Sequence, residues 1–380
     1  MSITQYKFTV QQEEQLHAIA ERLLADDKGI LAADESVGTI GKRFSSINVE
    51  NNQENRRNYR ELLFTTPGLE KFISGVIVFE ETLLDINSAA KPLVSTLLDK
   101  GVLVGIKVDQ GVVPLSVDSG VLLDESANDP QQTLTPEVVT QGLDGLAERL
   151  EIYKAQGASF AKWRSIVRVN TAQGMPSIQA YKANAECLAR YALECQKHGL
   201  VPIVEPEVLM DGDHSIDVSL DVTRQFLLYT FDALNSLGVY LPGIVIKTNF
   251  VRPAVNVSQA VSDEVVARKT LDLIYEIFPR EIPGITFLSG GMSEAQATAA
   301  LHYTNALDTR KFCKFSFSFG RALQSSCLKA WKGSMENIQA AQTQLLYRMQ
   351  LNHLACKAQY DPEMESGDSA KSLFEENYSY

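Results

Sequence analysis

The residues with the clearest chemical potential in this chain are charged side chains that follow short apolar runs. The clearest case is Lys247, which follows the run 242–246, a Pro-Gly turn signal and then three β-branched residues. An ammonium group at the end of a buried strand is costly unless it is paired or loses its proton. A lysine that has lost its proton is an amine nucleophile and can form a Schiff base with a carbonyl. The alternative is a lysine that extends into solvent as a solubilising cap.

The same construction recurs along the chain, which predicts a repeated strand-and-helix architecture. The apolar runs predicted as strands are 29–33, 75–79, 102–106, 158–161, 200–204, 244–246, 285–288 and 314–318. Helical spacing occupies 136–156, 178–198, 218–237, 261–278 and 293–307 between them. Eight alternating units predict an α/β fold, a single (β/α)8 TIM barrel over about 250 residues. An open doubly wound sheet is the alternative, but no Gly-x-Gly-x-x-Gly turn follows any of these runs.

In such a barrel, the carboxyl ends of the strands meet at one mouth, which predicts a shared site. The polar residues at or just beyond these ends are Asp34, Lys107, Lys162, Arg164, Glu205, Glu207, Lys247, Ser289 and Arg321. Three lysines converging there would lower one another's pKa, and the three carboxyl groups could transfer protons. We therefore predict a Schiff-base site, although a barrel rim decorated with solvated charges is the simpler interpretation of each residue alone.

A phosphate site is predicted beside it. Ser289, Gly290 and Gly291 precede a predicted helix and could offer backbone N–H groups to an anion, with Arg321 nearby. Lys107 and Arg164 could hold a second anionic group across the mouth. The alternative for the glycines is a plain helix-entry turn.

Other segments frame this barrel. We expect an additional N-terminal helix at 11–25, a long surface loop at 115–135, a long C-terminal helix over 322–359 and a flexible tail at 360–380. No linker is visible, so residues 1–359 are predicted to form one catalytic domain.

Composition narrows the class of protein. The 380 residues carry a net charge of −12, which argues against nucleic-acid and anionic-membrane binding. No apolar run approaches the roughly 18 residues of a membrane span, and residues 1–10 lack the apolar core of a secretory signal. The five cysteines form no Cys-x-x-Cys pair, and the five histidines show no metal-ligand spacing. We therefore expect a cytoplasmic protein without a metal site.

Several segments of the chain resemble class I fructose-bisphosphate aldolase. The segments are Leu31–Ser36, Glu54–Arg57, Gly105–Asp109, Gln141–Leu146, Phe160–Arg164, Val204–Glu207, Phe287–Gly291, Gly320–Leu323 and Leu328–Trp331. The resemblance runs from about residue 18 to 380. It implies a (β/α)8 barrel, a homotetramer, and no metal or cofactor. It also implies reversible cleavage of fructose 1,6-bisphosphate to dihydroxyacetone phosphate and glyceraldehyde 3-phosphate, in glycolysis, gluconeogenesis or the Calvin cycle.

The resemblance also implies roles for individual residues. Lys247 resembles the Schiff-base lysine, and Glu205, with Lys162 and Glu207 beside it, resembles the acid/base that dehydrates the carbinolamine. Asp34 resembles the base that takes the hydroxyl proton as the carbon–carbon bond breaks. Tyr380 resembles the C-terminal tyrosine that moves protons on the enamine. The implied phosphate contacts are Ser289, Gly290, Gly291 and Arg321 at the ketose end, and Ser36, Lys107 and Arg164 at the other, with Lys42 and Arg43 nearby.

Three features depart from the family pattern. Thr248 stands where proline usually follows the lysine, Phe319 replaces a frequent tyrosine, and the 115–135 loop is longer. The longer loop leaves open a different main substrate, fructose 1-phosphate or sedoheptulose 1,7-bisphosphate. A metal-dependent aldolase, a pyridoxal-phosphate enzyme and a non-catalytic scaffold are the competing hypotheses for the chain as a whole.

Overall fold

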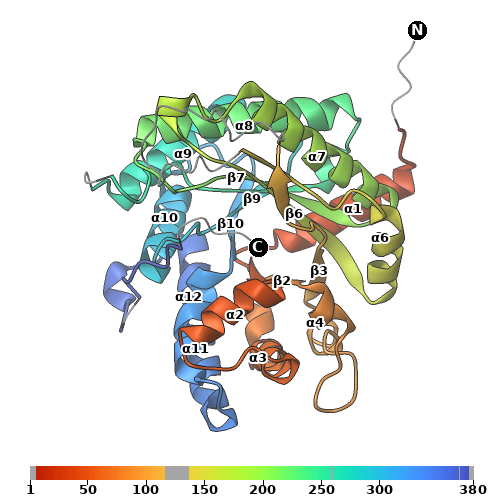
Figure 1. Cartoon of the computed structure of the whole chain (residues 1–380), viewed down its shortest axis with the longest axis vertical. Coiled ribbons are helices and arrows are strands. Elements are labelled where there is room, and N and C mark those ends of the chain that lie inside the picture. Colours follow the sequence, from red (N-terminus) through yellow and green to blue (C-terminus); the bar gives the residue numbers. More distant parts are fainter. Residues whose placement is uncertain (1–5, 116–136, 258–259, 368, 376–380) are drawn as a thin grey trace, which may run out of the picture.

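A closed ring of parallel strands forms the centre of the molecule, and helices surround it (Figure 1). This computed structural model describes residues 6–115, 137–257, 260–367 and 369–375. The barrel strands are β1 (Gly29–Ala33), β2 (Ile73–Val78), β3 (Leu103–Lys107), β6 (Ala158–Val167), β7 (Val201–Val208), β8 (Val245–Thr248), β9 (Gly284–Phe287) and β10 (Lys314–Phe319). They close in the order β1-β10-β9-β8-β7-β6-β3-β2. The predicted (β/α)8 barrel is confirmed.

Helices follow the strands and cover the outside of the barrel. The α-helices are α1 (Val10–Leu23), α2 (Val37–Ser45), α3 (Gln53–Thr65), α4 (Glu80–Leu84), α5 (Ser95–Leu98), α6 (Leu146–Ala155), α7 (Ile178–Lys197), α8 (Ile216–Ser236), α9 (Asp263–Ile277), α10 (Glu294–Leu307), α11 (Arg321–Trp331) and α12 (Ile338–Cys356). Short 3-10 helices are η1 (Leu69–Lys71), η2 (Thr171–Gln173), η3 (Leu241–Gly243), η4 (Met335–Asn337) and η5 (Pro362–Met364). Ser or Thr side chains cap several helix starts, as Ser36 does for α2 and Ser293 for α10.

The expected N-terminal helix has a structural role, because α1 closes the barrel at the amino ends of the strands. Its buried residues Leu16, Ala20 and Leu23 belong to one apolar cluster with interior residues at the start of the strands, among them Leu103 and Phe160. A barrel interior is a packed core rather than a pore. Among the described residues, this apolar cluster fills the amino-terminal end of the barrel, and the polar residues lie towards the opposite end.

Two sequence predictions of helices were wrong in extent. The region 136–156 contains the short strand β5 (Val138–Thr140), which pairs antiparallel with β4 (Val112–Pro114), and only its second half is helical. The predicted long C-terminal helix is divided into α11 and α12, because Lys332 and Gly333 adopt positive φ angles that interrupt helical hydrogen bonding. The predicted loop at 115–135 lies almost entirely outside the described residues.

Two strands are also longer than predicted. β6 continues to Val167 and β7 to Val208, so Lys162, Arg164 and Glu205 lie within strands rather than after them. These residues point into the barrel from a fixed β backbone, and a strand holds side chains more precisely than a loop does.

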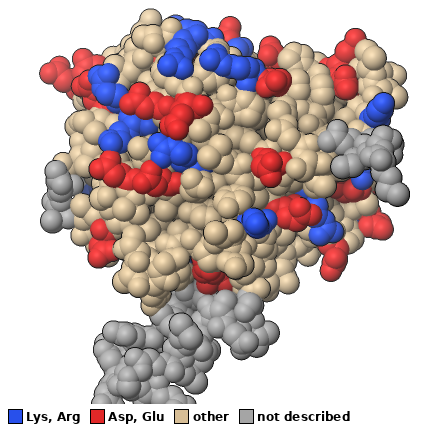
Figure 2. Space-filling view, turned by 90° about the horizontal axis from the view of Figure 1, so that it is seen from above, with Lys and Arg blue, Asp and Glu red and all other residues tan. Residues whose placement is uncertain are grey.

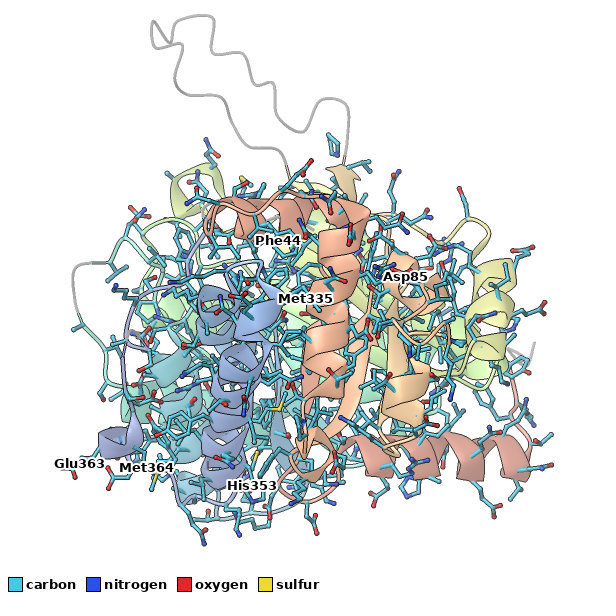
Figure 3. The ribbon with its side chains drawn as sticks, turned by 90° about the horizontal axis from the view of Figure 1, so that it is seen from below. Phe44, Asp85, Met335, His353, Glu363 and Met364 are labelled. Atoms are coloured by element: carbon cyan, nitrogen blue, oxygen red, sulfur yellow. The ribbon has the colours of Figure 1, made fainter. Side chains whose placement is uncertain are left out.

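The described part of the tail packs against the barrel. Arg348 of α12, which is buried, contacts the Glu365 carboxylate at 2.5 Å, and the Tyr360 hydroxyl donates to the same carboxylate at 2.9 Å. Figure 3 shows Glu363 at the outer edge of the molecule, past the end of α12 that carries His353. The chain then turns back, and the Ala295 N–H donates to the Ser369 carbonyl at 3.0 Å. Residues 369–375 therefore have a defined place near the start of α10.

The surface shows no concentration of one charge on the face drawn in Figure 2, where Lys and Arg side chains are interspersed with Asp and Glu. Among the helices that the structure describes, none is long and apolar enough to cross a membrane.

The barrel interior leaves no room for a side chain at Gly105 on β3. A Cβ placed there would overlap the ring of Phe160, which is fully buried. We predict that Gly105→Ala lowers the free energy of unfolding in urea by about 1–3 kcal/mol, because the core must shift to relieve the overlap.

Gly38 of α2 provides the matched control. A Cβ on Gly38 would have no atom within 4 Å, and the backbone there is helical. Gly38→Ala should therefore leave the free energy of unfolding unchanged or raise it by up to about 1 kcal/mol. Equal effects of the two substitutions would contradict this packing argument.

Candidate active site

A polar cavity lies at the carboxyl ends of the barrel strands. The residues that line it are Ala32, Arg43, Arg164, Glu205, Glu207, Lys247, Leu288, Ser289, Gly290, Ser318, Gly320 and Arg321. Most of the charged residues predicted from strand ends are therefore at one place, as parallel strands require.

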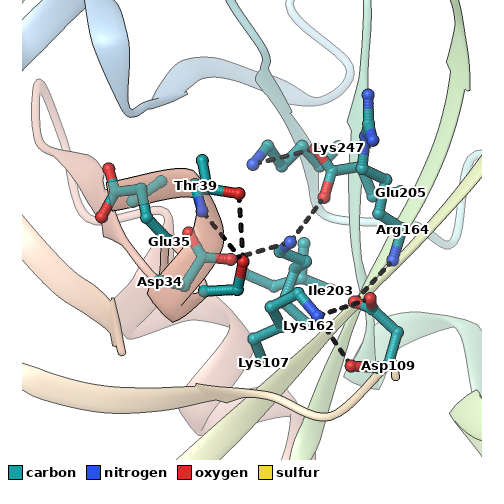
Figure 4. A network of polar contacts seen from close by, with 12 residues as sticks. Asp34, Glu35, Thr39, Lys107, Asp109, Lys162, Arg164, Ile203, Glu205 and Lys247 are labelled. Carbon is teal, nitrogen blue, oxygen red and sulfur yellow. Dashed lines mark hydrogen bonds and ion pairs between the residues drawn. The ribbon is translucent and has the colours of Figure 1, made fainter. Parts of the chain in front are cut away.

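Four buried charged residues form a continuous chain beside this cavity (Figure 4). Lys162 Nζ lies 2.8 Å from an Asp34 carboxylate oxygen and 3.4 Å from Glu205 Oε2. The other oxygen of Glu205, Oε1, lies 3.0 Å from Lys247 Nζ. Asp34 and Glu205 are each 1% exposed, Lys162 is fully buried, and Lys247 is 2% exposed. Two carboxylates thus alternate with two amines.

This alternation changes the electrostatic expectation from the sequence. The lysines were predicted to act on one another by repulsion, but each has a carboxylate within ion-pair distance. Burial raises the pKa of Asp34, but the ammonium groups of Lys162, Lys247 and Lys107 outweigh burial and lower it to about 2. Asp34 is therefore a carboxylate at neutral pH and can accept a proton.

Two further ion pairs hold basic residues on one side of the site. Lys107 Nζ contacts an Asp109 carboxylate oxygen at 2.7 Å and also donates to the Asp109 carbonyl at 2.7 Å. Arg164 Nε contacts Glu207 Oε2 at 2.5 Å. In the parallel register of β6 and β7, Arg164 is level with Glu205, and Glu207 lies two residues further along β7, within reach of the long Arg164 side chain. Glu207 thus holds Arg164 rather than the Schiff-base candidate.

Glu35 organises the opposite side of the cavity. Its buried carboxylate contacts Arg43 and Arg60, the latter at 2.6 Å, and accepts a hydrogen bond from Gln324 at 3.0 Å. Burial raises the pKa of Glu35, but the two guanidinium groups outweigh burial and keep it below its usual value. Arg43 consequently lies beside Gly320: its Nη2 atom is 3.9 Å from the point where a Cβ on that glycine would be.

The predicted anion loop has the expected glycine conformations. Gly290 and Gly291 both have positive φ angles, 50° and 82°, which residues with a Cβ rarely adopt. Ser289 and Gly290 line the cavity, whereas Gly291 faces the tail: a Cβ on it would lie 2.9 Å from Phe374 Cα. The loop, rather than the start of α10, therefore faces the cavity.

The tail also reaches the arginine of this loop region. Arg321 Nη1 donates to the Leu373 carbonyl at 2.6 Å, and the Leu373 N–H donates to the Gly291 carbonyl at 3.1 Å. The described tail therefore contacts both elements that were predicted to bind phosphate. Tyr380 itself lies outside the described residues.

Not every predicted residue lines the cavity. Ser36 caps α2 by accepting from the Thr39 N–H at 3.3 Å, and Lys42 is exposed near the end of that helix. Their substrate contacts stay predictions. Lys107 is buried against Asp109 beside the cavity rather than in its wall.

Sequence reasoning missed three residues of this site. Ser318 lines the cavity with a buried hydroxyl that has no hydrogen-bond partner among the described residues. Its position two residues before Gly320 on a strand was a usable signal. Asp109 was signalled by its spacing of two from Lys107. Nothing in the sequence distinguished Glu35 from an exposed acid.

The arrangement supports amine chemistry with proton transfer. A buried amine, Lys247, lies at the cavity wall beside a carboxylate that also contacts a second amine. The basic side chains of Arg43, Arg164 and Arg321 line the same cavity, with Arg43 held by Glu35 and Arg164 by Glu207. Such a site suits a carbonyl substrate with anionic groups at both ends.

Comparison with known proteins gives a consistent result. The family model "Fructose-bisphosphate aldolase class-I" matches residues 15–380. The chain is 46% identical to fructose-bisphosphate aldolase 2 of Caenorhabditis elegans, covering 98% of this chain and 97% of that protein. It is also 46% identical to the cytoplasmic isozyme of Spinacia oleracea, covering 97% and 98%. The structure of fructose-bisphosphate aldolase from Plasmodium falciparum, in complex with TRAP and a small molecule inhibitor, superimposes with a TM-score of 0.87 at 43% identity, covering 94% of this chain and 98% of that one.

The ion pairs of Asp34 predict a specific pH dependence. Because its pKa falls from 3.8 to about 2 on folding, its contribution to stability is complete above pH 4 and is lost as the pH falls through 2. NMR titration of the Asp34 carboxyl carbon should show a midpoint near 2. In Lys162→Met, that midpoint should rise, since the largest opposing charge is gone. An unchanged midpoint in the variant would contradict this electrostatic account.

Proposed function

The chain belongs to the class I fructose-bisphosphate aldolase family, and on that premise we propose how its residues carry out the reaction. The protein is a carbon–carbon lyase that reversibly cleaves fructose 1,6-bisphosphate to dihydroxyacetone phosphate and glyceraldehyde 3-phosphate through a lysine Schiff base. The observation that carries the residue assignment is Lys247, a buried amine at the cavity wall with Glu205 at 3.0 Å.

In the first step, Lys247 passes its ammonium proton to the Glu205 carboxylate, and the free amine attacks the ketone carbon of the substrate to form a carbinolamine. Glu205 then donates a proton to the carbinolamine hydroxyl, which leaves as water, and an iminium remains. Glu205 can do this because it contacts Lys247 through one oxygen and Lys162 through the other. Lys162 would stabilise the carboxylate that results and set its orientation.

In the second step, Asp34 accepts the proton of the substrate hydroxyl next to the bond that breaks. The electron pair of that carbon–carbon bond moves to the iminium, so that an enamine forms and glyceraldehyde 3-phosphate is released. The low pKa of Asp34 keeps it ionised before this step. Protonation of the enamine and hydrolysis then release dihydroxyacetone phosphate and restore the Lys247 amine.

The flanking basic groups would bind the two phosphates. We assign Ser289, Gly290 and Arg321 to the ketose-end phosphate. Arg43 belongs on this side too, because Glu35 holds it next to Gly320. Arg164 and Lys107, held by Glu207 and Asp109, would serve the other phosphate, with Ser36 and Lys42 nearby.

A different main ketose is not favoured, because the matching family model and the relatives compared are all named for fructose bisphosphate. Phosphorylated sugars are the substrates. We further propose a homotetramer and a cytoplasmic location. The first is supported by the family resemblance, and the second by the spinach relative, which is named a cytoplasmic isozyme.

We also propose that residues 1–359 form the catalytic barrel and that 360–380 form a tail that reaches the active site. Support comes from the contacts of Leu373 with Gly291 and Arg321, seven residues before Tyr380. We propose that Tyr380, further along this tail, moves protons on the enamine.

The Schiff-base assignment predicts covalent trapping. Borohydride added with dihydroxyacetone phosphate should attach the substrate at Lys247, identified by peptide mass spectrometry, and chelator should not change cleavage activity. Lys247→Met should abolish both trapping and cleavage, because no other side chain replaces the amine. Lys182→Met, which removes an exposed lysine of α7, should leave both unchanged.

Labelling at another lysine would overturn the assignment of Lys247. Loss of activity in chelator would instead favour a metal-dependent aldolase, and a visible absorption band in the purified protein would favour a pyridoxal-phosphate enzyme.

The tail assignment predicts a selective defect. Tyr380→Phe should slow exchange of the α-proton of dihydroxyacetone phosphate with solvent by about 100-fold, since a proton-transfer group is lost. Borohydride trapping at Lys247 should persist. Tyr378→Phe is the control in the same segment and should show neither effect. Equal exchange rates in wild type and Tyr380→Phe would exclude this role.

A further inference from the structure

The contact between Lys247 and Glu205 lies just beyond the end of a strand ladder. Backbone pairing of β7 with β8 covers Ile203 with Val245 and Val204 with Ile246. Glu205 and Lys247 are the next residue on each strand. Their 3.0 Å separation therefore depends on what holds the two strands together above the last backbone pair.

Two side chains, at the last residue of β8 and at the residue after it, continue the hydrogen bonding between β7 and β8. The Thr248 hydroxyl donates to the Pro206 carbonyl at 3.2 Å, and the Asn249 side-chain oxygen accepts from the Val208 N–H at 2.9 Å. Both side chains are buried, Thr248 at 2% exposure and Asn249 at 6%. We call these two hydrogen bonds the β7–β8 seam.

Pro206 occupies the position between the two acids of the site, Glu205 and Glu207. Proline has no N–H, so β7 cannot donate a hydrogen bond at this residue. Its buried carbonyl still requires a hydrogen-bond donor. The Thr248 hydroxyl supplies it. A valine or a proline at position 248 could not.

Thr248 also connects in the other direction around the barrel. Its carbonyl accepts from the Leu288 N–H at 3.0 Å, immediately before Ser289 of the anion loop. The residue that follows Lys247 is thus fixed to the acid-bearing strand on one side and to the anion loop on the other.

We propose that Thr248 is a positioning residue that holds Lys247 against Glu205 through its hydroxyl bond to Pro206. This inference rests on the proposed role of Lys247 as the Schiff-base lysine. It also gives a function to the threonine that departs from the family pattern. Small displacements of reacting groups cause large losses in rate, so the seam should affect turnover more than substrate binding.

The test compares Thr248→Val, which removes the hydroxyl and keeps the branched shape, with Thr248→Ser, which keeps the hydroxyl. For cleavage of fructose 1,6-bisphosphate, Thr248→Val should lower kcat about tenfold and leave KM within about twofold, because the phosphate contacts remain. The pH profile of kcat should also shift, because the distance between the Glu205 carboxylate and Lys247 Nζ would change in this variant. Thr248→Ser should restore both towards wild type.

Thr270→Val is the matched control. Thr270 is a buried threonine of α9, also 2% exposed, whose hydroxyl accepts from the Val251 N–H at 2.9 Å outside the seam. This variant should lose thermal stability comparable to that of Thr248→Val, with kcat and the pH profile unchanged. If Thr248→Val does not fold, Thr248→Ala is a second hydroxyl-free variant that must show the same kcat loss.

The inference is overturned if Thr248→Val keeps the wild-type kcat and pH profile, if Thr248→Ser is as impaired as Thr248→Val, or if Thr270→Val loses kcat equally.

Borohydride trapping separates failure of this inference from failure of the proposed function. Absence of label at Lys247 in the wild type refutes the proposed function itself. Label at Lys247 at equal rates in wild type and Thr248→Val refutes only the role of Thr248.

Discussion

Charge compensation among buried side chains in the barrel sets the arrangement of the site. Lys162 is fully buried and touches two carboxylates, Asp34 at 2.8 Å and Glu205 at 3.4 Å. Removing one partner of such a cluster leaves an uncompensated buried charge, which is far more costly than an exposed one. Lys162 thus fixes the positions of the Asp34 and Glu205 carboxylates, and through Glu205 it also fixes the ion pair of Lys247.

This charged cluster depends on the apolar packing that fills the amino-terminal end of the barrel. Helix α1 closes the amino ends of the strands with Leu16, Ala20 and Leu23, and the ring of Phe160 fills the interior next to Gly105. With the lower half filled by apolar side chains, the charged residues are confined to the upper half. The fold therefore places the apolar core residues at the amino end of the barrel axis and the charged residues at the carboxyl end.

The C-terminal tail links the outer helices to this upper half. Buried Arg348 fixes the tail at Glu365, and eight residues later Leu373 begins the stretch that lies over Gly291. The positive φ of Gly291 and its lack of a side chain allow this close approach. The Leu373 carbonyl accepts a hydrogen bond from the Arg321 guanidinium group, so the phosphate that we propose to bind at Arg321 would be coupled to the position of the tail.

Apolar runs and helical stripes in the chain were enough to predict the barrel and the convergence of Lys247, Glu205 and Asp34, because such patterns record burial directly. They did not reveal which charged residues form ion pairs with one another. Ion pairs such as Glu35 with Arg43 and Arg60, or Glu207 with Arg164, depend on strand register and helix placement.

The same patterns also misjudged the 136–156 segment, where tertiary pairing with β4 overrides helical spacing. Folding alone decided that the lysines are balanced by carboxylates and that Thr248 bonds to Pro206. Both facts concern residues that are distant in the chain and meet only when the barrel closes.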